Sequence, residues 1–337
     1  MLYLTTRSTT DAYTPFRTLG QGRGDDQGLF VPLQMPRLDA SQILSLKTRT
    51  FGQNVADILN LLLNARLDGM DVDFCIGKYP IKFVPMSNRT VVAETWHNPD
   101  FDFARAVRNL SGRIRGLEDT SGVSTDWMWI SARIAFIFSL YGLLSQKEKA
   151  GICNPIDIAV PAGDFAAPMA AWYAREMGLP IENIICSCDD NDAAWELLHG
   201  QKLDFSGNMK IPADLERLVY AIGGQEEAIK FVRAAESKAV YSFREGEDNS
   251  LGKEIYAAVI SAERRASVIN NVYRTSAYIL DPGSAMAYGG LQDFRATDGK
   301  LNMTLIITER SPICSAQTVA SAMEITVDVL RERLNLK

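Results

Sequence analysis

Apolar residues in the first part of the chain recur at helical spacing. Over residues 41–67 they lie three and four positions apart, which predicts two helices, with Gly52 as the break between them and Gly69 as the stop. β-Branched residues at 91–94 predict a short strand, and residues 101–115 are expected to form another helix. We assign the first two helices to an amino-terminal lobe.

The pattern changes after residue 155. An apolar run at 156–161 is followed by a glycine-bearing turn, a helix at 166–177 and a second apolar run at 181–186. Parallel strands that are buried on both faces have this appearance, with a crossover helix between them. The pattern therefore predicts an open, mostly parallel α/β sheet with helices on both faces. Its further elements are expected as helices at 212–223, 225–234, 251–271 and 316–334 and a strand at 301–308.

Residues 127–144 are apolar almost throughout and approach the length of a membrane span, which needs about 20 apolar residues. Arg133 interrupts the run, and hydrophilic sequence flanks it on both sides. With a mean hydropathy of -0.06 for the whole chain, we expect a helix buried between layers of the protein and no association with a membrane.

Charge and composition exclude several functions. The chain of 337 residues has 41 acidic and 35 basic residues, a formal charge of -6, and no basic cluster, so nucleic acid is not an expected partner. Five scattered cysteines favour reduced thiols, and with only two histidines we expect no metal site. The first residues contain no secretory signal pattern, so we expect a cytoplasmic protein.

Several segments carry family-like motifs in one consistent order. Residues 3–7 (YLTTR) and 26–32 (DQGLFVP) match Y-x-S-T-R and D-G-G-L-y-v-P, and residues 94–105 (ETWHNPDFDFAR) align without a gap with E-L-F-H-G-P-T-L-A-F-K-D. Residues 160–167 (VPAGDFAA) resemble V-P-S-G-N-F-G-N, and residues 281–288 (DPGSAMAY) resemble D-P-H-T-A-x-A-Y. On these motifs the chain resembles the threonine synthases, pyridoxal phosphate enzymes of the tryptophan synthase β-like fold, also called fold type II.

The resemblance implies where a cofactor site would lie and how this chain departs from it. The cofactor lysine of the family falls on Ala104, so no catalytic residue is expected for that chemistry. The corresponding phosphate loop is degenerate, and Thr308 would lie beside it; the loop residues are Ala162, Gly163, Asp164, Phe165 and Ala166. Candidate residues of the surrounding crevice are His97, Asn98, Asp281 and Ser284.

A domain-sized segment of the family is also absent. Threonine synthases carry it between the lysine motif and an N-S-x-N-x-x-R helix, which corresponds here to residues 123–133. This chain instead has a polar, glycine-bearing linker at 112–126, so about one small domain is missing. We therefore expect a lobe at 1–90, a remnant of the truncated smaller domain with the linker at 91–125, and a large α/β domain at 126–337.

The changes have direct chemical consequences. Pyridoxal phosphate enzymes hold the cofactor as a Schiff base on a lysine amine, which the methyl group of Ala104 cannot form. Asp164 places a carboxylate where the phosphate dianion would bind, and Ala166 adds a Cβ where glycine permits close approach. We therefore expect no bound pyridoxal phosphate. A capping role for Asp164 at the following helix is the simpler interpretation of that residue.

Three hypotheses follow. The first is a non-catalytic threonine synthase-like protein that binds a small anionic metabolite or a partner subunit. The second is an enzyme with new chemistry in the same crevice, and the third is a lyase of the threonine synthase family that uses another lysine, Lys78 or Lys82 being nearest in sequence. A homodimer is expected to cover surface that the truncated domain leaves exposed.

Overall fold

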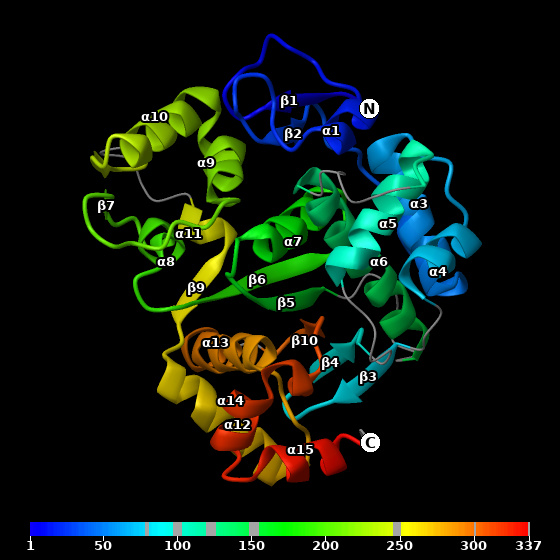
Figure 1. Cartoon of the computed structure of the whole chain (residues 1–337), viewed down its shortest axis with the longest axis vertical. Coiled ribbons are helices and arrows are strands. Elements are labelled where there is room, and N and C mark those ends of the chain that lie inside the picture. The colour runs from blue at the N-terminus through cyan, green and yellow to red at the C-terminus, as the bar shows by residue number, and fades with distance from the viewer. Residues whose placement is uncertain are drawn as a thin grey trace.

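The computed structural model describes residues 1–77, 81–96, 103–118, 126–147, 155–244, 251–299 and 301–335. Its centre is a six-stranded sheet in the order β3-β4-β10-β5-β6-β9 (Figure 1). All neighbouring strands are parallel except β3, which pairs antiparallel with β4 at the edge. The prediction of an open, mostly parallel α/β sheet is confirmed. The strands are β3 (Lys82–Pro85), β4 (Thr90–Glu94), β5 (Ile156–Pro161), β6 (Ile181–Cys188), β9 (Tyr256–Val259) and β10 (Met303–Thr308).

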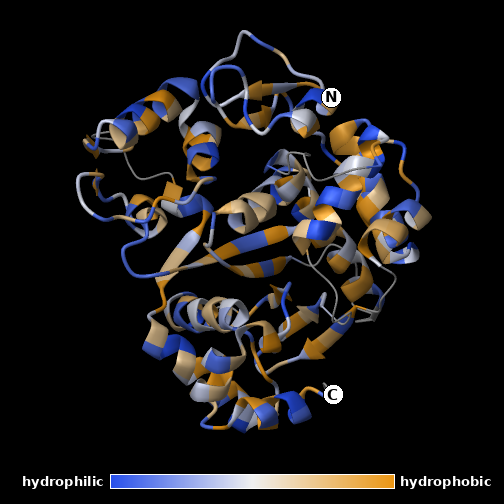
Figure 2. Ribbon diagram, viewed as in Figure 1, coloured by the Kyte–Doolittle hydropathy of each residue, from blue (hydrophilic) through white to orange (hydrophobic). Residues whose placement is uncertain are grey.

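Helices cover both faces of the sheet. One face packs against α7 (Ala166–Glu176), which in turn contacts α6 (Asp126–Lys147), and the other packs against α13 (Pro282–Asp298) (Figure 1). Successive strand residues enter opposite cores, because side chains alternate along a strand. Ile158 belongs to the α6–α7 core and Ala159 to the α13 core. Figure 2 shows the hydrophobic residues that run along β5 and β6 between these layers.

The remaining elements flank this sandwich. Two short antiparallel pairs are formed by β1 (Tyr3–Thr5) with β2 (Phe30–Pro32) and by β7 (Leu203–Asp204) with β8 (Val240–Tyr241). The other helices are α1 (Pro15–Gly20), α2 (Ala40–Ser45), α3 (Phe51–Leu63), α4 (Gly69–Ile76), α5 (Phe103–Arg115), α8 (Ala193–Leu198), α9 (Leu215–Gly223), α10 (Gln225–Glu236), α11 (Leu251–Glu254), α12 (Ala262–Ser276), α14 (Ala316–Ala322) and α15 (Val327–Arg333), with 3₁₀ turns at Leu46–Thr48 and Pro312–Ser315.

The apolar segment around Arg133 is a core helix, as expected. Among the described helices α6 alone is long and apolar enough to cross a membrane, and 78% of its apolar window is buried inside the protein. It packs on α3, α5 and α7. Only residues 116–125 separate α5 from α6 in the chain, so no domain-sized segment lies between these two helices. The predicted linker starts too early, because its residues 112–115 belong to α5.

Two glycine assignments in the amino-terminal lobe are wrong. Gly52 is the second residue of α3, and the helix begins where Thr50 caps it in a capping box with Gln53. Gly69 opens α4, capped by Asp68. A Cβ on Gly52 would lie 2.7 Å from the Gly69 carbonyl oxygen, so these glycines allow α3 and α4 to approach closely.

Three predictions in the second half also need correction. Residues 251–271, expected as one helix, contain α11, strand β9 and the start of α12. Residues 316–334 form two helices, α14 and α15, because the chain turns through Glu324, whose φ is +57°. Helix α13 was not predicted at all. The predicted strands and helices at 156–161, 166–177, 181–186, 212–223, 225–234 and 301–308 are confirmed to within a few residues at their ends.

Candidate functional site

The carboxyl ends of the parallel strands lie along one edge of the sheet, where open α/β sheets place their ligands. Thr308 ends β10, and its Oγ1 donates to Asp281 Oδ2 at 2.7 Å. Ser284 also donates from its hydroxyl to Asp281 Oδ2. Three of the residues predicted to border the crevice are therefore in contact.

Asp281 has a clear structural task at this position. It is the N-cap of α13, and its Oδ1 accepts from the amides of Gly283 at 2.9 Å and Ser284 at 3.3 Å. A side-chain oxygen at this position satisfies amides that have no partner within the helix. Thr95 extends the cluster to β4, since its amide and its Oγ1 both donate to the Thr308 carbonyl oxygen.

The loop between β5 and α7 was predicted as a degenerate phosphate site, and its geometry places a carboxylate there. Asp164 Oδ1 accepts from the Ala166 amide at 3.0 Å. The Phe165 amide donates to the Ala162 carbonyl oxygen at 2.6 Å. Two amides at the start of α7 are thus already bonded, one of them to an acidic side chain.

This arrangement is a poor fit to a phosphate group. Helix N-termini bind anions through amides that are free to donate. Here Asp164 supplies an anion from within the chain, and a phosphate dianion would lie beside its carboxylate. Asp164 makes the bond expected of a capping side chain, although the cap residue itself is Phe165, with φ at +69°.

The position that the motif assigns to a lysine is occupied by Ala104. It is the second residue of α5 and is half-buried, while the next residue, Arg105, is exposed.

Lys82 faces Glu94 across the β3–β4 ladder, and its Nζ lies 3.4 Å from Glu94 Oε2. Lys82 therefore brings an amine to the end of β4, where the Glu94 carboxylate pairs with it. The same carboxylate lies beside Tyr278, whose pKa is raised first by burial and then by the charge of Glu94. His97, Asn98 and Lys78 lie outside the described residues.

An ion pair at the end of β10 was missed by sequence reasoning. Arg133 of α6 donates from Nη2 to Glu309 Oε2 at 2.9 Å. Its guanidinium carbon lies 4.5 Å from the Phe103 ring centroid and 4.4 Å from the Trp129 ring centroid. Arg133 is the only basic residue within the apolar run 127–144, and this isolated charge was the sequence signal for a buried ion pair.

A buried arginine below the α7 loop was also missed. Arg217 Nε donates to the Phe30 carbonyl oxygen at 3.0 Å, Nη2 donates to Asp126 Oδ2 at 2.6 Å, and Nη1 donates to Asp214. Burial raises the pKa of Asp214 to about 6. The Asp214 amide donates to the Asp164 carbonyl oxygen at 2.9 Å, which ties this network to the loop.

The cysteines among the described residues are unpaired, as expected. Cys186 and Cys188 lie on one face of β6, with sulfurs 4.0 Å apart and no solvent exposure. Burial raises the pKa of Cys186 well above its ordinary value. Within the described segments, no group of three or more His, Cys, Asp or Glu side chains is placed to hold a metal ion.

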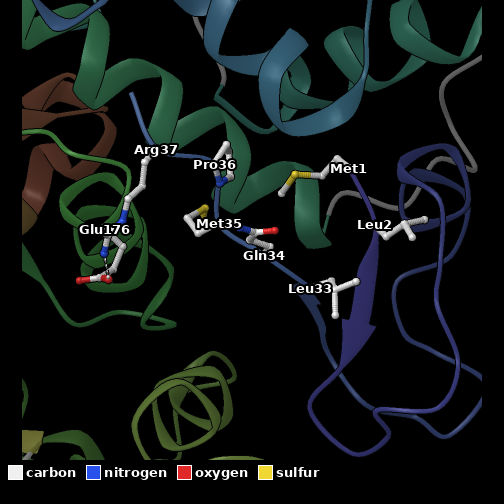
Figure 3. Close-up of a pocket in the computed structure, with 8 residues that line it drawn as sticks. All are labelled: Met1, Leu2, Leu33, Gln34, Met35, Pro36, Arg37 and Glu176. Carbon is white, nitrogen blue, oxygen red and sulfur yellow. Dashed lines mark ion pairs between the residues drawn. The ribbon is translucent and has the colours of Figure 1, made fainter. Parts of the chain in front are cut away.

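A pocket of about 650 Å³ lies away from the strand ends, at the amino terminus (Figure 3). Met1 and Leu2 line it together with the segment 33–37. Arg37 and Glu176 point toward each other on its far side, with nitrogen and oxygen 3.7 Å apart. Its lining is mainly apolar and includes none of the residues predicted for the crevice.

Known proteins match the chain in sequence. Residues 2–78 match the family model described as threonine synthase N terminus. Threonine synthase-like 1 of Homo sapiens is 25% identical over 181 residues, which are 50% of this chain and 24% of that protein. Threonine synthase of Pseudomonas aeruginosa is 23% identical over 225 residues, 61% of this chain and 47% of that protein. The matched part therefore spans about a quarter of the first relative and about half of the second.

Solved structures match over the whole chain. The pyridoxal phosphate-bound threonine synthase from Brucella melitensis superposes with a TM-score of 0.81 at 16% identity, covering 100% of this chain and 95% of that chain. The yeast threonine synthase gives 0.80 at 16% identity and covers 94% of that chain. The fold is that of the pyridoxal phosphate-dependent threonine synthases, a class of α/β proteins. In sequence and in fold the chain is similar to the threonine synthases.

Proposed function

We propose that this threonine synthase-like protein does not carry out pyridoxal phosphate chemistry and instead binds a small anionic metabolite at the carboxyl ends of its strands. The observation that carries the proposal is the contact between Asp164 and the Ala166 amide. In this proposal the Asp164 carboxylate takes the place of the phosphate that the family motif would bind. Ala104, in the position of the motif's lysine, supports the same conclusion independently.

Absorbance spectroscopy tests the first half of the proposal. Purified protein is mixed with pyridoxal phosphate, and the internal-aldimine band is followed before and after borohydride reduction. We expect no band stronger than that of a denatured control. Lysines of the unfolded chain also react with the aldehyde, so the control measures the reaction that needs no binding site. A stable band on one lysine, identified by peptide mapping, would support the lyase hypothesis and overturn the proposal; Lys82 is the described lysine to inspect first.

Two designed variants sharpen this test. Ala104→Lys restores an amine on α5 but leaves the Asp164 carboxylate in the loop. Ala104→Lys combined with Asp164→Asn removes the charge while retaining an oxygen for the Ala166 amide. The double variant is expected to bind pyridoxal phosphate at least tenfold more tightly than the single one, about 1.4 kcal/mol. Equal binding would show that Asp164 does not exclude phosphate.

Thermal shift measurements test the second half. Amino acids, phosphorylated amino acids and sugar phosphates are screened, because a ligand that binds the native state stabilises it by mass action. At least one small anion is expected to raise the unfolding midpoint. A screen in which none does would contradict metabolite binding, and turnover of a bound compound would contradict a non-catalytic role.

A further inference from the structure

The outer face of α4 exposes two large apolar side chains. Met70 is 77% exposed and Phe74 is 87% exposed, whereas Val72, Cys75 and Ile76 of the same helix are buried. Residues four positions apart lie on one side of a helix, so Met70 and Phe74 form a continuous apolar ridge. Two such side chains present on the order of 300 Å² to water, and a contiguous apolar patch of this size often marks an interaction surface.

The ridge is held on a fixed support. Helix α4 packs against α3 and α5, and Figure 1 shows it at the outer rim of the molecule, away from the central sheet. Arg113 Nε of α5 donates to Asp71 Oδ1 of α4 at 2.8 Å. Asn109 Nδ2 donates to the Cys75 carbonyl oxygen at 3.3 Å. The ridge can therefore meet a partner without rearrangement of these helices.

The two helices carry opposite charges. Helix α4 and its cap contain three aspartates and no basic residue, and α5 contains four arginines and no acidic residue. At 100° per residue, Asp71 and Asp73 lie on opposite flanks of the ridge. On the first flank Arg113 of α5 pairs with Asp71. On the second, Asp73 is half-buried, and none of the described residues forms an ion pair with it.

This distribution of charge fits a second copy of the same chain. A two-fold axis parallel to α4 brings the two ridges together and places α5 of each copy against the Asp73 flank of the other. The arginines of α5 then supply the missing cation for Asp73, once in each direction. A partner of uniform charge would be repelled by one of the two helices.

We propose that the chain forms a symmetric homodimer through the ridge of Met70 and Phe74, with α5 of each copy beside Asp73 of the other. No residue of the crevice takes part, so the inference goes beyond the proposed function and does not depend on it. A standard interface buries about 800 Å² per partner, of which the ridge supplies less than half, so we expect a weak dimer with a Kd on the order of 10 μM.

Sedimentation velocity of the full chain at low ionic strength tests the dimer. The apparent mass should rise with concentration from 37.3 kDa toward twice that value. Phe74→Ser and Met70→Ser should each weaken association about tenfold or more, because each removes an apolar anchor. Both side chains are exposed in a single copy, so these variants should fold normally, which far-ultraviolet circular dichroism verifies. Leu33→Ser is the matched control, since Leu33 is 54% exposed and lies outside the ridge; it should leave association unchanged.

Exchange of charges tests the arrangement of the two copies. Asp73→Lys places a cation against the arginines of the partner copy, and Arg105→Glu places an anion of α5 against the partner copy's aspartates. Each variant alone should therefore associate about tenfold more weakly than native protein. An equimolar mixture of the two variants should dimerise again, because both contacts of the mixed dimer then join opposite charges.

Three results would overturn the inference. The first is native protein that stays monomeric up to roughly 100 μM, which would mean that the ridge serves another partner or none. The second is a native dimer that survives Phe74→Ser or that Leu33→Ser disrupts. The third is a mixture of Asp73→Lys with Arg105→Glu that is no more dimeric than either variant alone. Failure of the proposed function shows itself separately, as an aldimine band with pyridoxal phosphate.

Discussion

Thr308 Oγ1 lies 2.7 Å from Asp281 Oδ2, and this hydrogen bond joins the end of β10 to the first turn of α13. Because Asp281 also caps α13, Asp281→Ala should lower the free energy of unfolding by about 1–2 kcal/mol. Urea denaturation measures the change. Asp39→Ala, which removes the cap of the shorter, more exposed helix α2, is the control. A loss for Asp281→Ala no larger than that of the control would contradict this.

In the charged network below α7, replacement of Arg217 is expected to lower the free energy of unfolding the most. Replacing it by glutamine leaves Asp214 and Asp126 without their cation in a buried site. Removal of one partner from a buried ion pair costs about 3–5 kcal/mol. The exposed pair of Arg274 and Glu324 provides the comparison, and Arg274→Gln should change stability by less than about 0.5 kcal/mol in the same urea titration.

Stability should depend on pH through Asp214. Burial raises its pKa from 3.8 to about 6, so its protonation stabilises the folded state below pH 3.8, and this contribution is lost as the pH rises through about 6. Asp214→Asn removes the titration. The free energy of unfolding of Asp214→Asn minus that of native protein should therefore increase between about pH 4 and pH 7, by on the order of 1–3 kcal/mol. A decrease over this range would show that attraction to Arg217 outweighs burial.

Gly290 allows α13 to pack directly on β6. A Cβ at this position would overlap Ser187 Oγ and lie 3.3 Å from Ser187 Cβ. Gly290→Ala should cost about 1–3 kcal/mol, a usual range for overpacking. Ser187→Ala should restore most of that loss in the double variant, because the displaced hydroxyl is buried and has no hydrogen-bond partner in the described part of the chain. Unfolding midpoints in guanidinium chloride measure both, and independent effects of the two changes would refute the contact.

The sequence predicted the central strands well because their burial on both faces leaves continuous apolar runs, as at 156–161 and 181–186. Strand β9 escaped prediction, since Tyr256–Val259 is short and its apolar spacing continues that of the flanking helices. Its conformation depends on pairing with β6, where Tyr256 lies opposite Ile185. Such tertiary pairing leaves no local signal.

Helix α13 was missed for a different reason. Gly289 and Gly290 lower helix propensity, yet both are needed because Ile260 and Ser187 pack against the helix there. In the candidate site, the motif residues Thr308 and Ser284 both donate hydrogen bonds to Asp281. Glu309 could not be paired with Arg133 in advance, because 176 positions separate them and only the fold makes them neighbours.

Alkylation of the two buried cysteines of β6 can be used to measure unfolding of this protein. Cys186 and Cys188 have no solvent exposure, so an alkylating reagent has no path to either sulfur while the strand stays in place. Burial also raises the pKa of Cys186, which disfavours its reactive thiolate. Exposed Cys314 reacts from the outset and calibrates the reagent within the same molecule. The rate at which the inner pair is modified, relative to Cys314, therefore times the opening of the sheet's centre.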